Sequence, residues 1–260
     1  MNGMTIFKHS IRQVLGNLGV AIRVSGGFWV LLVIAFFVYA TIVYLSGSAA
    51  LSILFGIALF VGVIWGISMI AVVWHRFVLL EEQPSGFIPN SKDLPIWSYF
   101  WYGVGIGILV FIVLFILLFI VSVLTSSEYV LRAFDQQTVT MIPEDIALRA
   151  FAGIVATILY LRFALILPAV ALEGSLTIGD SWSETKQYFG AIAMLAVLLT
   201  ILNGAVMLVF GTLLSAVSAS NAGVIIVTLL SVVFQWFYFM LNISILSTLY
   251  GHIVQKREVY

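Results

Sequence analysis

The run SYFWYGVGIGILVFIVLFILLFIVSVL, at residues 98–124, decides the fold class of this 260-residue chain. It contains no charged residue. It is also longer than the roughly 20 apolar residues that a helix needs to cross the hydrocarbon core of a bilayer. Lipid offers backbone polar groups no hydrogen-bond partner, so such a run must be helical. The run shows no alternation of polar and apolar residues, which argues against a β-barrel.

Five further apolar runs occur, at residues 28–46, 51–74, 147–167, 190–215 and 223–249. The chain is 63% hydrophobic and 8% charged, whereas a typical soluble domain has about 25% charged residues. A chain this poor in charge cannot cover its own surface in water. The sequence therefore predicts an all-α polytopic membrane protein, with six transmembrane helices in a domain at 28–250. An amphipathic helix at 1–27 precedes this domain, and a tail at 251–260 follows it.

The distribution of lysine and arginine predicts how the chain lies in the membrane. Six spans place both termini and the loops 75–97 and 162–189 on one side. That side carries nine of the eleven basic residues, namely Lys8, Arg12, Arg23, Arg76, Lys92, Arg162, Lys186, Lys256 and Arg257. The other side carries Arg132 and Arg149. Lysine and arginine accumulate on the cytoplasmic side of membrane proteins, so both termini are expected in the cytoplasm.

The first 27 residues have the pattern of an amphipathic surface helix. One helical face carries Phe7, Ile11, Val14, Leu18, Ala21 and Ile22, and the other carries Lys8, Arg12, Gln13, Gly16 and Arg23. We expect Gly26 and Gly27 to break this helix before the first span. Its apolar face can lie in the inner headgroup layer, or it can cover the cytoplasmic side of the protein itself. The sequence favours neither alternative.

Two other segments resemble surface elements. The segment SLTIGDSWSETKQYFG, at 175–190, contains a loose capping box at Thr177 and Asp180 and a stricter one at Ser181 and Glu184. Gly190 is expected to end that helix or to act as a joint. The segment 92–102 is a weaker example. Since a surface segment thus precedes each pair of spans, the pattern predicts three helix-hairpin repeats.

Arg76 and Arg162 stand inside two similar motifs, WHRFVLLEE at 74–82 and YLRFALILP at 160–168. Both arginines fall near the predicted cytoplasmic border. A long side chain there can simply snorkel to the headgroups. The alternative is that the guanidinium binds a lipid phosphate or pairs with a carboxylate, because its fork matches two oxygens. The candidate carboxylates are Glu81, Glu82, Glu173, Asp180 and Glu184. His75 would add a titratable group to such a lipid- or carboxylate-binding site.

Polar residues within the spans are few. Asn203, Gln235 and Asn242 are expected to hydrogen-bond between helices or, alternatively, to line a polar path. The spacings Gly62-xxx-Gly66 and Gly103-xxx-Gly107 favour close helix packing. The chain has no cysteine and only three widely separated histidines. We therefore expect no metal site and no cofactor, and nothing indicates a nucleic-acid partner.

The stretches WHRFVLLEE and RFALILPAVALEGSLTIGDSWSETKQYFG, at 162–190, resemble a family of bacterial inner-membrane proteins. They are similar to the membrane domain attached to some glycerophosphoryl diester phosphodiesterases. The resemblance matches Arg162 and Pro168 to an arginine followed by a proline, and Trp182 and Gly190 to a surface helix. No segment is long enough for the catalytic barrel, so no catalytic residue is carried over. The resemblance implies a lipid-associated protein of the bacterial inner membrane with no defined activity.

The expected function is therefore non-enzymatic. We expect the protein to organise membrane lipids, anionic ones among them, or other membrane proteins. The alternative is a transporter or permease for a lipid-like or small amphiphilic substrate. A transporter needs a continuous polar cavity between its helices, whereas an organising protein needs none.

Overall fold

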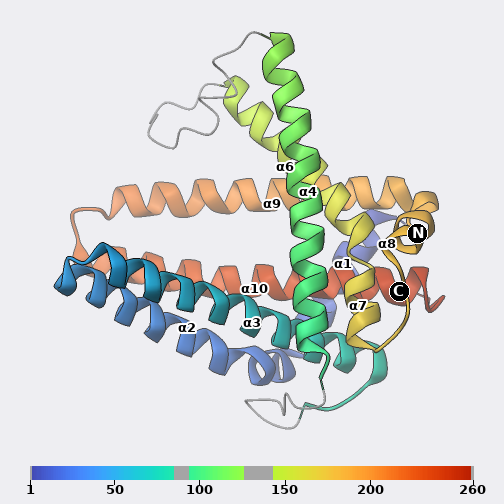
Figure 1. The fold of residues 1–260 in the computed structure, drawn as a ribbon, viewed down its shortest axis with the longest axis horizontal. Coiled ribbons are helices and arrows are strands. Elements are labelled where there is room, and N and C mark those ends of the chain that lie inside the picture. Colours follow the sequence, from blue (N-terminus) through green and yellow to red (C-terminus); the bar gives the residue numbers. More distant parts are fainter. Residues whose placement is uncertain (1, 85–93, 126–142, 259–260) are drawn as a thin grey trace.

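The computed structural model describes residues 2–84, 94–125 and 143–258, and all regular secondary structure in these ranges is helical (Figure 1). This confirms the predicted all-α class. The helices are α1 (Gly3–Gly16), α2 (Leu18–Ser46), α3 (Ala49–Leu80), α4 (Ile96–Thr125), α6 (Pro143–Phe163), α7 (Ile166–Ala171), α8 (Ile178–Glu184), the 3-10 turn η1 (Lys186–Tyr188), α9 (Phe189–Ala216) and α10 (Asn221–Ile253).

Six segments of the described chain are long and apolar enough to cross a membrane, which confirms the predicted number of spans. They comprise α2, α3, α4, α6 with α7, η1 with α9, and α10. Residues 126–142, which include Arg132 and most of the loop predicted between the third and fourth spans, lie outside the described residues, as does the basic residue Lys92.

The six spans form three hairpins (Figure 1). The α2–α3 and α9–α10 hairpins extend in the same general direction, and the α4–α6 pair runs across them. Gly47, at the turn between α2 and α3, has a φ of 57°, which favours glycine. Ser48 and Ser220 begin α3 and α10 by accepting hydrogen bonds from the backbone N–H groups of Leu51 and Gly223. Both termini lie at the end of the molecule opposite these two turns.

The hydrophobic core lies where the hairpins converge, close to both termini. The second half of α10 is at its centre, since almost every residue from Met240 to Ile253 is buried. The inner part of α3, the whole of α7, the start of α9 and one face of α1 pack around it. The outer parts of the hairpins are exposed. In the most apolar 18 residues of α2 none is buried, whereas 56% are buried in the corresponding part of the span Ile146–Ala171.

The predicted break at Gly26 and Gly27 is wrong, because α2 runs through both glycines. A glycine in a helix interior costs only about 1 kcal/mol relative to alanine, and in lipid the alternative is an unpaired backbone. The break lies instead at Asn17. Its backbone N–H bonds the Val14 carbonyl, and its side chain donates to the Gln13 carbonyl at 2.8 Å. The first 27 residues are therefore one short helix and the beginning of the first span.

The fourth span is interrupted between α6 and α7, at Ala164 and Leu165. Pro168 explains the position of this break. A proline has no N–H to donate, and its ring clashes with the carbonyl four residues earlier, here that of Ala164. The Ala164 carbonyl accepts a hydrogen bond from Leu167 instead, at 3.0 Å. The chain therefore turns at this point, and α7 lies fully buried in the core.

The segment after α7 contains the predicted capping box of Thr177 and Asp180, which is confirmed with both of its hydrogen bonds. The box suggested at Ser181 and Glu184 is wrong, since Ser181 lies inside α8 and its hydroxyl donates to the Arg162 carbonyl. Gly190 does not end a helix either, because it is the second residue of α9. A surface element thus precedes α9, as the repeat pattern predicts.

Candidate functional site

Arg76, near the end of α3, uses its guanidinium fork on two carboxylates. Its Nε donates to Glu82 Oε2 at 2.7 Å and its Nη2 donates to Glu82 Oε1 at 2.9 Å. Its Nη1 donates to the Ala171 carbonyl at 3.1 Å and to Glu173 at 3.2 Å. Planar, two-point pairing of this kind is specific to arginine. Arg76 therefore joins the end of α3 to the end of α7, and it uses two of the five carboxylates proposed from the sequence.

A hollow of about 640 Å³ lies beside this ion-pair cluster, between the start of α4 and the loop from α7 to α8. Its polar lining includes Glu173, Ser98 and Thr177, and its apolar lining includes Ile166 and Val170. Glu173 is already paired with Arg76, so the only charged lining side chain is partly neutralised. An amphiphile of modest size fits this mixed lining, but no described side chain that lines the hollow has a buried polar atom without a partner.

Arg162, in the last turn of α6, is enclosed by the segment that follows α7. Its guanidinium carbon lies 3.3 Å from the centroid of the Trp182 ring, and its Nη2 donates to the Trp182 carbonyl at 2.8 Å. Its Nε donates to Thr185 Oγ1 at 3.3 Å. The Phe163 ring also stacks on Trp182, with ring centroids 4.9 Å apart. Only 9% of Arg162 is exposed, so its guanidinium group binds the protein's own helix α8 and not a lipid headgroup.

His75 does not face the surface, which corrects its assignment as a lipid- or carboxylate-binding candidate. It is fully buried and joins three helices. Its Nδ1 lies 2.8 Å from Ser247 Oγ on α10, and its Nε2 lies 3.1 Å from Tyr99 Oη on α4. Ser247 donates its own proton to the Ile243 carbonyl. That arrangement assigns the proton to Nδ1 of a neutral imidazole, which then accepts from Tyr99.

Sequence reasoning missed a row of buried polar side chains along α10, to which His75 is hydrogen-bonded and which we call the polar seam. Trp74 Nε1 donates to Ser244 Oγ at 2.9 Å, and Ser10 Oγ of α1 lies 3.2 Å from Thr248 Oγ1. A residue spacing of three and four places Ser244, Ser247 and Thr248 on one helical face, which is the signal that could have found them. Hydrogen bonds in this low-dielectric core fix the relative positions of α1, α3 and α10.

The three polar residues of the fifth and sixth spans do not join helices, contrary to the expectation. Asn203 is exposed, and its amide reaches Met207 of the same helix at 3.9 Å. Asn242 donates to the Tyr238 carbonyl of its own helix at 2.7 Å. Gln235 is exposed on α10. The side chains of Asn203 and Gln235 thus face outward instead of lining a path between helices.

Only one of the four glycines in the two predicted pairs allows close packing. A side chain at Gly66 would overlap the Phe28 ring, whose nearest atom is 1.8 Å from an added Cβ. Gly66 therefore lets α2 and α3 approach each other. An added Cβ at Gly62, Gly103 or Gly107 would meet nothing within 4 Å, so these three glycines do not pack as expected.

The N-terminal helix α1 has one buried and one exposed face. Ile6, Ser10 and Val14 are fully buried against α9 and α10, so the apolar face covers the protein itself. The opposite face of α1 and one side of the first turns of α2 are exposed, and we call this the basic surface. It carries the exposed charges and the exposed apolar side chains Lys8, Arg12, Arg23, Leu15, Leu18 and Ile22.

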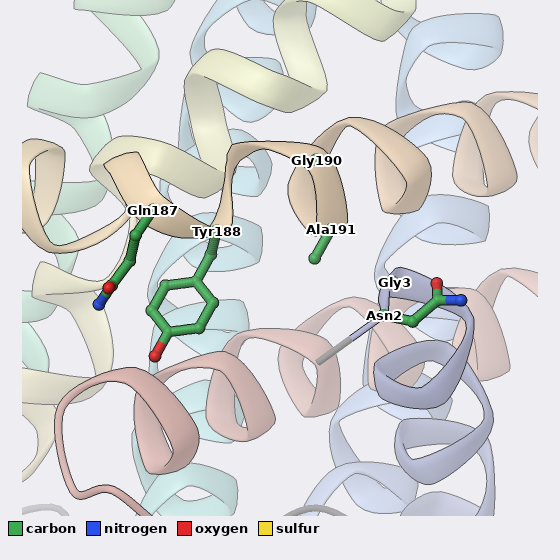
Figure 2. A pocket seen from close by; sticks show the side chains of 6 residues that line it. All are labelled: Asn2, Gly3, Gln187, Tyr188, Gly190 and Ala191. Atoms are coloured by element: carbon green, nitrogen blue, oxygen red, sulfur yellow. The ribbon is translucent and has the colours of Figure 1, made fainter.

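A hollow of about 430 Å³ lies between the start of α1 and the junction of η1 with α9. Figure 2 shows Gln187, Tyr188 and Ala191 on one side of it and Asn2 and Gly3 on the other. All its lining residues are uncharged. Asn2 already accepts a hydrogen bond from the Met4 N–H. This hollow therefore has no feature that would select a charged ligand.

Among the residues described, no three histidine, aspartate or glutamate side chains come together as they would around a metal ion. Comparisons of the chain with protein-family models, with curated proteins and with solved structures find no match. The membrane character of the chain thus rests on its own six apolar spans.

Proposed function

We propose that this integral membrane protein organises lipid without catalysing a reaction, as a multi-pass protein of the bacterial inner membrane with both termini in the cytoplasm. The observation that carries the proposal is the contrast between a buried core and exposed apolar hairpins. Nine residues of α4 between Ile108 and Val123 are large, apolar and exposed. Lipid chains are the natural solvent for such surfaces. The hairpins therefore present a large apolar area to lipid.

The basic surface supports a preference for anionic lipid. Lys8, Arg12 and Arg23 are exposed close to Leu15, Leu18 and Ile22 in the sequence, so charge and apolar side chains are combined. Such a combination suits the boundary between headgroups and acyl chains. Each basic residue near an anionic surface gains roughly 1 kcal/mol. The nine-to-two distribution of lysine and arginine supports placing this end of the molecule in the cytoplasm.

A transporter for an amphiphilic substrate is the alternative. It would require polar side chains to line a path through the spans. The outward positions of Asn203 and Gln235, and the self-contained hydrogen bond of Asn242, do not support such a path. The buried seam of His75, Ser247 and Tyr99 is a set of satisfied contacts within the core.

The lipid proposal is tested by lipid retention. The protein is reconstituted in vesicles that contain equal amounts of phosphatidylcholine and phosphatidylglycerol, and it is then extracted in mild detergent. Native mass spectrometry identifies and quantifies the lipids that remain bound. We expect phosphatidylglycerol to be enriched severalfold. Replacing Lys8, Arg12 and Arg23 by glutamine should remove the enrichment. Each of these charges raises the affinity for anionic lipid by a factor of up to about five.

The matched control exchanges the same residues while keeping their charge, as Lys8→Arg, Arg12→Lys and Arg23→Lys. It should retain the enrichment, because attraction to anionic lipid depends on charge and not on the guanidinium fork. Equal amounts of both lipids on the unaltered protein would contradict the proposal. A protein-dependent flux of a fluorescent lipid across vesicles, abolished by Gln235→Leu, would favour the transporter.

A further inference from the structure

A third hollow, of about 320 Å³, lies where α1 and α3 end. We call it the amide hollow, and its lining residues are Gln13, Asn17, Phe77, Val78, Glu81 and Gln83. Three of these carry side-chain amides and one carries a carboxylate, so the lining contains an anion and no cation. The C-terminal end of α1 adds the negative end of a helix dipole, whereas the end of α3 is already occupied by Arg257. The charge of this hollow therefore favours a positive ligand.

Gln13 supplies the strongest sign of an absent partner. Its Oε1 atom is buried and has no hydrogen-bond partner. Buried acceptors are nearly always paired in native structures, because leaving one unpaired is costly. The neighbouring Asn17 uses its amide N–H on the Gln13 backbone carbonyl, which leaves the Asn17 Oδ1 as a further acceptor. A ligand in the hollow that donates hydrogen bonds would meet the Asn17 Oδ1, and it would meet the Gln13 Oε1 once that side chain turns toward the hollow.

Glu81 supplies the charge. It is exposed at the end of α3 and makes no ion pair within the described part of the chain, whereas its neighbour Glu82 is paired with Arg76. Its φ of 60° is a left-handed conformation in which glycine is the usual residue. Arg257 donates to the carbonyls of Val78 and Leu79, at 3.5 and 2.6 Å. It thus occupies the end of α3, and the acceptors left for a ligand are side chains.

We propose that the amide hollow binds a primary ammonium group. Such a group offers three N–H donors and a positive charge, which match the two amide oxygens and the Glu81 carboxylate. Phe77 and Val78 offer an apolar wall to the carbons next to the nitrogen. A quaternary ammonium carries no N–H and leaves Gln13 unpaired. The amine can be the headgroup of phosphatidylethanolamine or a free amine, and only the first source rests on the proposed association with lipid.

The test measures the melting temperature of the full chain in nanodiscs. One set contains phosphatidylethanolamine and the other phosphatidylcholine, with the same anionic fraction, and free ethanolamine or choline chloride is then added to the second set. A higher melting temperature with phosphatidylethanolamine alone identifies the lipid headgroup as the ligand. A rise with free ethanolamine as well identifies the amine itself. The proposal is overturned if neither phosphatidylethanolamine nor ethanolamine raises the melting temperature, or if choline raises it as much as ethanolamine does.

Three variants assign the effect to the hollow. Glu81→Gln should raise the amine concentration that gives half of the full melting-temperature shift by tenfold or more, as expected for loss of a charged hydrogen bond. Gln13→Met should abolish the response without lowering the melting temperature in phosphatidylcholine, because it removes an unpaired oxygen at similar volume. Gln255→Met is the matched control, since Gln255 also has a buried unpaired Oε1 but does not line the hollow.

Gln255→Met should keep the full amine response. Loss of the response in Gln255→Met, or an unchanged response in Gln13→Met, would show that the amine acts elsewhere. Enrichment of phosphatidylglycerol at the basic surface depends on Lys8, Arg12 and Arg23, none of which lines the amide hollow. The proposed function and the amine site can therefore fail separately.

Discussion

Replacing Arg162 by lysine tests whether its guanidinium fork, and not merely its charge, holds the surface helix α8 to the end of α6. Lysine keeps the charge and one hydrogen bond. It loses the second hydrogen bond and most of the contact with the Trp182 ring. The ring contact is worth about 1 kcal/mol at a half-exposed tryptophan. The hydrogen bond is worth about the same again. The variant should therefore lose about 2 kcal/mol of stability.

A loss of this size lowers the melting temperature of a protein of this length by about 4–8 °C. The assay is thermal unfolding of the purified protein in mild detergent. A double-mutant cycle with Trp182→Leu isolates the contact between the two side chains, and we expect a coupling energy of about 1 kcal/mol. An Arg162→Lys variant that melts within 1 °C of the unaltered protein would refute this account and leave Arg162 as an anchor.

Arg76→Lys is the comparison variant. Its partners Glu82 and Glu173 have side chains that are 48% and 63% exposed, so water screens their attraction. Exposed ion pairs contribute about 1 kcal/mol or less. We therefore expect a smaller loss than at Arg162, even though Arg76 makes more hydrogen bonds.

Two further perturbations test the packing of the first hairpin and the cap of α8. Gly66→Ala should cost about 1–2 kcal/mol in thermal unfolding, because its Cβ overlaps the Phe28 ring. Gly62→Ala, which meets open space, should be neutral or stabilising, and an equal loss in both variants would contradict the packing. Hydrogen bonds from Thr177 lower the pKa of Asp180, so the cap stabilises the protein at neutral pH and weakens as pH falls through that lowered pKa. The melting temperatures of the unaltered protein and of Asp180→Asn should therefore differ at neutral pH and converge in acid, and a gap independent of pH would count against the cap.

The sequence alone was sufficient for the helical class and the number of spans, because uncharged runs of this length have no other stable state in lipid. It also located the capping box at Thr177, whose residues are three positions apart. The break after the first helix was wrongly placed at Gly26 and Gly27, because glycine is permitted in a helix that lipid enforces. Pairs such as Trp74 with Ser244 were missed because 170 residues separate them, and local pattern contains no information about such contacts.

The role of each arginine was only partly predictable. Spacing along α3 and α6 placed both residues near the end of a span, which fits an anchor and a binding group equally well. The deciding facts are tertiary. Arg76 meets the end of α7, and Arg162 meets α8. Their carbonyl and ring partners have no signature in the local sequence.

The central claim is that lipid surrounds the outer parts of the three hairpins on nearly every face, while the hydrophobic core joins the hairpins where they converge. The most direct test is the oxygen accessibility of spin labels on single cysteines in vesicles, since the chain has no native cysteine. Labels are placed at three consecutive residues of α4, Phe111, Ile112 and Val113, which are 67, 47 and 37% exposed. A label at Ile245, which is fully buried, serves as the core reference. The account predicts high oxygen accessibility at all three α4 positions and low accessibility at 245, whereas a packed six-helix bundle would protect at least one of the three and would contradict it.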